Sequence, residues 1–132
     1  MRFPKTIQPA NEEILSMYLQ RVAKANYYNT RELFIGFGVN PHSHINHRID
    51  VAPKDFIDVS LAAQYTGQSI DALLSMSFYP LERKFVRSSH RTSFELLREL
   101  IDANRRFCPT CLKEFDDNKR YGIYNRIWQI TV

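Results

Sequence analysis

The sequence predicts a mainly α-helical protein, because apolar residues recur at helical spacing in several separate stretches. Residues typical of helix starts, namely asparagine, proline and serine, precede those stretches. The 132 residues are enough for one domain, or for one small domain with a short appendage. With 44% apolar and 13% aromatic residues, the composition supports a hydrophobic core and argues against disorder.

Charge and hydropathy place few limits on the partner but favour a cytoplasmic protein. No apolar run approaches the length of a membrane span, and the N-terminus lacks the apolar core of a signal peptide. The net charge is +4 and the isoelectric point is near 9.2. This charge leans only mildly toward a polyanionic partner, because many basic proteins bind none.

The first helix is expected after an extended segment, Met1 to Ala10, that contains two prolines. We expect Asn11 to cap this helix, with Glu12 and Glu13 in its first turn, where the helix dipole favours acidic side chains. One apolar face follows at helical spacing: Leu15, Tyr18, Leu19 and Val22.

A second, shorter helix is expected to start at Asn29 or Thr30 and to end at Gly36 and Gly38. Its apolar residues are Leu33, Phe34 and Phe37. The following loop, residues 40–51, has no period and holds His42, His44 and His47. Imidazoles are good zinc ligands, but no cysteine or carboxylate partner stands nearby, so we favour a solvated polar loop.

Residues 53–78 match a helix-turn-helix pattern. Pro53 suits the first turn of a helix carrying Phe56, Ile57, Leu61 and Tyr65, Thr66-Gly67-Gln68 forms a turn, and Ser69 caps a second helix to about Ser77. In such motifs the second helix enters the DNA major groove, which makes Gln68 and Ser69 candidate DNA-binding residues. Asp71 would repel phosphate, so a hairpin that only packs is an equally open alternative.

After Pro80 the chain becomes basic, and these residues are candidate phosphate contacts: Arg83, Lys84, Arg87 and Arg91. A solvated loop is the alternative, since that is the usual meaning of a run of charges. Ser93 is expected to cap a final helix that leads to Arg105 and Arg106.

Both cysteines, Cys108 and Cys111, follow that helix with two residues between them, a spacing that lets two thiolates bind one metal ion. Zinc prefers four ligands, so the pair makes half a site. The apolar run around Trp128 predicts a short β-strand, as at the start of a zinc ribbon, and we expect the chain to be a fragment cut before the ribbon closes. A redox pair is a weaker alternative, because a helix precedes the cysteines and acidic residues follow them. No catalytic constellation is recognisable, which predicts a protein that is not an enzyme.

Taken in order, these segments resemble the N-terminal region of the TniQ family of transposition proteins. The resemblance rests on the opening helix from Glu12 to Ala23, on Leu61 to Met76, on Arg106 to Leu112, and on Ile127 to Ile130. It implies a helical domain over residues 1–104 and the start of a zinc ribbon over 105–132. In the family a Cys-x-x-His pair follows the tryptophan strand, and this chain ends before such a pair.

The resemblance implies a non-enzymatic factor that directs transposon insertion to a target site. Members of the family recognise DNA directly or bridge a CRISPR effector complex to the transposition proteins. Three alternatives stay open: a protein-interaction adaptor, an unrelated helix-turn-helix regulator, and a homodimer in which two chains supply four thiolates to one zinc ion.

Overall fold

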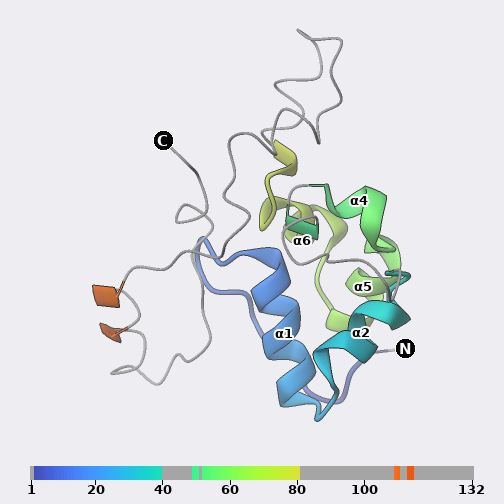
Figure 1. The fold of residues 1–132 in the computed structure, drawn as a ribbon, viewed down its shortest axis with the longest axis horizontal. Coiled ribbons are helices and arrows are strands. Elements are labelled where there is room, and N and C mark those ends of the chain that lie inside the picture. The colour runs from blue at the N-terminus through green and yellow to red at the C-terminus, as the bar shows by residue number, and fades with distance from the viewer. Residues whose placement is uncertain (1, 40–48, 51, 81–108, 111–112, 115–132) are drawn as a thin grey trace, which may run out of the picture.

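The computed structural model describes residues 2–39, 49–50, 52–80, 109–110 and 113–114, and the helices are the regular elements there. They are α1 (Leu15–Ala25), α2 (Thr30–Gly36), α4 (Pro53–Phe56), α5 (Val59–Thr66) and α6 (Ile70–Ser75) (Figure 1). The mainly α-helical class is therefore confirmed for this part of the chain. None of the helices in it is long and apolar enough to cross a membrane. The predicted strand near Trp128 and the helix after Ser93 lie outside the described residues.

The first helix begins later than the sequence predicts. Its N-cap is Ile14, so Asn11 does not cap it and its first turn contains no acidic residue. Glu12 has a left-handed backbone with φ of 59°, and Glu13 is fully buried before the helix starts. The prediction failed because Glu13 is engaged by Arg21, eight residues later, instead of serving the helix dipole.

The second helix matches its prediction. Asn29 is the N-cap, and its side chain accepts a hydrogen bond from the backbone N–H of Arg31 at 2.9 Å. Leu33 and Phe34 are buried, as is Phe37 at the C-cap. Gly38 follows with φ of 96°, a conformation that glycine adopts without a steric penalty.

The single helix predicted from Pro53 to Tyr65 is in fact two helices. Pro53 does occupy the first turn of α4, but Ile57 is extended and ends that helix after one turn. Asp58 then caps α5, its carboxylate accepting from Leu61 N–H at 3.0 Å. The Asp58 backbone N–H donates to the Phe37 carbonyl at 2.7 Å, so a contact with the end of α2 breaks the helix.

A shared core joins these helices, with α1 packed against α2 and α5 packed against α6. Asp50, which is buried, accepts hydrogen bonds from the Ser16 N–H at 2.8 Å and the Ser16 hydroxyl at 2.7 Å. Its own carbonyl accepts from Phe78 N–H at 2.7 Å, and Leu15 N–H donates to the Met76 carbonyl at 3.0 Å. The start of α1 is thereby fixed beside the end of α6.

Candidate nucleic-acid interface

The turn between α5 and α6 is specified by the residues that close each helix. Gly67 is the C-cap of α5 with φ of 75°, in the left-handed region that favours glycine. Ser69 is the N-cap of α6, and its hydroxyl oxygen accepts from the Ala72 N–H at 3.0 Å. The sequence predicted a turn at Thr66-Gly67-Gln68 and the Ser69 cap; the left-handed Gly67 and this cap together set the angle at which α6 leaves α5.

Gln68 and Ser69, the predicted DNA-binding residues of the turn, differ in exposure. Ser69 is exposed and uses one lone pair in its cap, which leaves the hydroxyl proton available to an acceptor such as a phosphate. Gln68 is only half-buried, and its side chain lies close enough to the Tyr18 hydroxyl to lower the pKa of that group. Gln68 therefore places the turn near α1.

The exposed face of α6 is poor in groups that bind phosphate. Ile70, Asp71 and Ser75 are its exposed residues, and none is cationic. Ile70 has 41% of its surface exposed, which is high for a large apolar side chain. This helix alone supplies no positive charge to a DNA partner.

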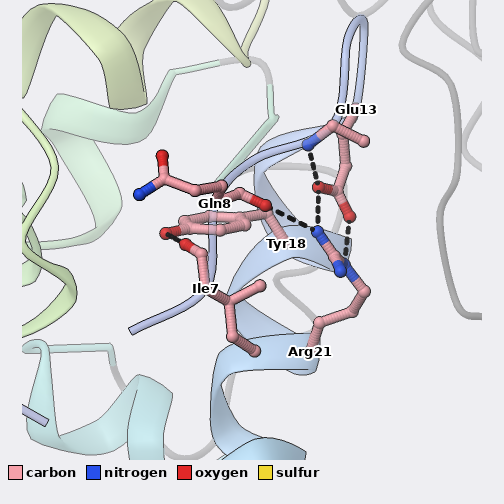
Figure 2. A network of polar contacts seen from close by, with 6 residues as sticks. Ile7, Gln8, Glu13, Tyr18 and Arg21 are labelled. Carbon is pink, nitrogen blue, oxygen red and sulfur yellow. Dashed lines mark hydrogen bonds and ion pairs between the residues drawn. The ribbon is translucent and has the colours of Figure 1, made fainter. Parts of the chain in front are cut away.

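A partly buried polar network links the segment before α1 to that helix (Figure 2). The carboxylate of Glu13, which is fully buried, accepts from Arg21 Nε at 2.7 Å and from Arg21 Nη2 at 2.8 Å. Arg21 Nη2 also donates to the Gln8 carbonyl at 3.2 Å, and the Tyr18 hydroxyl donates to the Ile7 carbonyl at 2.9 Å. The bidentate geometry is the strongest form of such a pair, and it holds the segment before α1 onto the helix.

The pKa of the Tyr18 hydroxyl is raised from 10.0 to about 12, first by burial and then by the neighbouring Glu13 carboxylate. The Arg21 cation and hydrogen bonds with the side chains of Thr66 and Gln68 act in the opposite direction. Tyr18 is therefore a neutral donor at physiological pH. It lies where residues 7–8, α1 and the turn after α5 meet.

The N-terminal segment, which the sequence analysis gave no role, reaches this turn. Phe3 N–H donates to the Tyr65 carbonyl at 2.9 Å, and the Phe3 and Tyr65 rings are 5.1 Å apart. A Cβ atom placed on Gly67 would lie 3.2 Å from Arg2 Nε, so the Arg2 side chain covers the turn. The only hint in the sequence was an arginine beside an aromatic residue, which by itself specifies no position.

The other candidate residues cannot be placed beside this turn. Arg83, Lys84, Arg87 and Arg91 lie outside the described residues, as do Cys108 and Cys111. Between and beyond the cysteines, residues 109–110 and 113–114 are helical and exposed. Within the described ranges, no three histidine, cysteine or acidic side chains gather as a metal site would require.

Comparison with known proteins gives one family. The model of the family described as TniQ matches residues 4–132, nearly the whole chain. No curated protein and no solved structure matches the chain.

Proposed function

The chain belongs to the TniQ family, a group of transposition-associated proteins, and from this premise we propose that it is a non-enzymatic targeting factor. In this role it binds DNA and directs transposon insertion to a target site. It brings the transposition machinery to that site, either through DNA that it recognises itself or as the bridge to a CRISPR effector complex.

The observation that carries the DNA-binding part of the proposal is the hairpin of α5 and α6. Two helices of eight and six residues are joined by a short turn that glycine closes on one side and serine on the other. The turn leaves Ser69 exposed, and Gln68 places it near α1. In a helix-turn-helix the second helix lies in the major groove, with its N-terminal residues at the bases, while the first helix crosses the DNA backbone.

In this proposal, the segment after α6 supplies the positive charge that holds the DNA. Arg83, Lys84, Arg87 and Arg91 neutralise phosphates, and Ser69 donates its hydroxyl to a phosphate oxygen. Gln68 has a double role, since its side chain also lies close to the Tyr18 hydroxyl. Because the exposed surface of α6 offers few groups that can contact bases, only few base contacts would determine the preference for a DNA sequence.

A pair of substitutions at Ser69 tests the hairpin. Asparagine and aspartate are both good N-caps, so Ser69→Asn and Ser69→Asp should preserve α6. Only aspartate adds a negative charge, and it should weaken binding to a 30-base-pair duplex about tenfold at low salt, as measured by fluorescence anisotropy. Equal affinities for the two variants would remove this turn from the DNA interface.

The basic segment has its own test. The variant Arg83→Ala/Lys84→Ala/Arg87→Ala removes three cations, and we expect both weaker duplex binding and a shallower dependence of affinity on salt. Since each lost phosphate contact lowers the slope of log K against log salt by about 0.9, three contacts lower it by about 2.7. Unchanged binding and slope would exclude the segment from the interface.

An adaptor is the second candidate function, favoured by the surface of α6. Exposed Ile70 beside Asp71 is a combination that suits a protein groove better than a phosphate backbone. If α6 docks on a protein of the transposition or effector machinery, Ile70→Ser should reduce that association and leave duplex affinity unchanged. Protein association without any DNA binding at low salt would favour the adaptor alone.

For the C-terminal segment we propose that Cys108 and Cys111 supply two of the four ligands of a structural zinc ion. Two thiolates at this spacing fit zinc, and a second chain would supply the remaining ligands in a homodimer. Elemental analysis of the purified chain tests this directly. Half an equivalent of zinc per chain would indicate a shared site in a homodimer, and no zinc would refute binding by this polypeptide.

A further inference from the structure

A second exposed surface lies across the molecule from α4, where the N-terminal segment crosses the turn between α1 and α2 (Figure 1). It consists of Arg2, Lys5, Tyr27 and Tyr28, and we call it the tyrosine strip. Asn26 joins the two segments, because its side chain accepts from Lys5 N–H at 2.9 Å and donates to the Lys5 carbonyl at 2.9 Å. The position of Lys5 is therefore fixed by its main chain.

Tyr27 occupies a backbone position that normally belongs to glycine. Its N–H donates to the Lys24 carbonyl at 3.2 Å, and the Tyr28 N–H donates to the Ala23 carbonyl at 2.9 Å. This pair of bonds closes the C-terminus of α1, and it requires a left-handed residue at Tyr27, whose φ is 60°. A tyrosine in this conformation is strained by about 1 kcal/mol or more, which glycine would relieve.

The strained residue carries a ring that contributes almost nothing to the core. Tyr27 is 89% exposed, and Tyr28 is 50% exposed with its ring 5.5 Å from that of Phe3. Lys5 Nζ lies 5.4 Å from the centre of the Tyr27 ring. An exposed aromatic ring held by a strained backbone, with a cation beside it, is typical of a surface that contacts a ligand.

The charge around the tyrosine strip selects an anionic partner. Residues 2–8 and 22–31 contain no acidic side chain, whereas Arg2, Lys5, Lys24 and Arg31 are cations. The next acidic residues along the chain are Glu12 and Glu13 after the first segment, Glu13 being paired with Arg21, and Glu32 after the second. Cations interleaved with exposed rings match the phosphates and bases of a single strand, where each base can stack on an aromatic ring.

From these contacts we propose that the tyrosine strip binds single-stranded nucleic acid, with phosphates at Arg2 and Lys5 and a base stacked on Tyr27. The proposal deepens the proposed function, since it rests on a nucleic-acid partner for the chain. Arg2 also covers the turn at Gly67, two residues before Ser69, and so links the strip to the hairpin of α5 and α6.

The test uses fluorescein-labelled dT20 and the full chain. Tyr27→Asn removes the ring and keeps the backbone, because asparagine tolerates the left-handed conformation. We expect about a fivefold or larger loss of dT20 affinity with no change in salt dependence. Lys5→Ala should instead lower the slope of log K against log salt by about 0.7, the value for one contact with a single strand.

The matched control is Lys54→Ala. Lys54 is exposed, and its Nζ lies 4.7 Å from the centre of the Tyr79 ring, so this variant removes the same kind of cation–ring pair from α4. We expect wild-type affinity and slope for Lys54→Ala. Wild-type dT20 binding by Tyr27→Asn and Lys5→Ala, with circular dichroism showing both folded, would overturn the proposal.

The outcome separates this inference from the proposed function. If the strip variants bind dT20 normally while the triple variant in residues 83–87 loses duplex binding, the strip proposal is wrong and the targeting proposal stands. If the strip variants lose dT20 and the triple variant changes nothing, the strip proposal holds without the basic segment. If the chain binds a polyglutamate peptide but not dT20, the strip proposal is overturned in favour of an acidic protein partner.

Discussion

Arg21→Ala is the most informative perturbation of the fold, because it leaves the buried Glu13 carboxylate without its ion-pair partner. Glu13 has no exposed side-chain surface, and its two carboxylate oxygens both accept from the Arg21 guanidinium. Among the residues that the structure describes, Ala10 N–H, at 3.0 Å, is the hydrogen-bond donor that the Glu13 carboxylate keeps after truncation. The substitution also releases the Gln8 carbonyl, to which Arg21 donates.

The expected loss of unfolding free energy in Arg21→Ala follows from the exposure of Glu13 and Arg21. Removing one member of a buried ion pair destabilises a protein by about 3–5 kcal/mol. Arg21 is 19% exposed, so water can reach part of the vacated space and the loss should fall near the low end, at about 3 kcal/mol. This is a large fraction of the 5–15 kcal/mol that stabilises a typical domain.

Urea unfolding followed by far-ultraviolet circular dichroism measures this loss. Lys24→Ala on the same helix is the control, since it removes an exposed cation near the C-terminus and should cost about 0.5 kcal/mol. Adding Glu13→Gln to Arg21→Ala should recover about 1 kcal/mol or more, because the stranded carboxylate becomes neutral. A loss below 1 kcal/mol for Arg21→Ala, or a double variant less stable than the single one, would refute a buried, desolvated pair.

Substitutions at three further positions test the site. The pKa of Tyr18 is about 12 in the folded state and 10.0 in the unfolded state, so the stability of the wild-type protein should fall as pH rises from 10 to 12. Tyr18→Phe should remove that fall, and the same dependence of stability on pH in both proteins would contradict the raised pKa. Gly67→Ala should destabilise by about 1 kcal/mol or more in thermal unfolding, because φ is 75° and the new Cβ meets Arg2 at 3.2 Å. Ser69→Ala should cost about 1 kcal/mol and Ser69→Gly only a few tenths, whereas equal losses would argue against the cap.

The parts of the fold that the sequence predicts correctly are those governed by neighbouring residues. Asn29 and Ser69 cap the helices that follow them, and Gly67 takes the left-handed conformation after α5. Each of these signals acts within three residues, through a hydrogen bond or a backbone preference. The apolar face of α1 is likewise buried, since its spacing alone determines which side packs.

The errors arise where a distant contact overrides a local preference. Glu13 would suit a first helical turn, but Arg21 binds it and α1 begins after it. Asp58 would be tolerated inside a helix, yet its N–H bonds to the Phe37 carbonyl and it becomes a cap. The tyrosine strip could not be predicted, because Lys5 meets Tyr27 only through the folded path of the chain.

The salt dependence of duplex affinity tests the targeting proposal most directly. We would measure the binding of a 30-base-pair duplex between about 50 and 200 mM salt, for the wild-type chain and for Arg83→Ala/Lys84→Ala/Arg87→Ala. We expect binding that weakens steeply with salt, and a shallower slope in the variant. Absence of duplex binding at the lowest salt, or the same slope for both proteins, would contradict the targeting proposal.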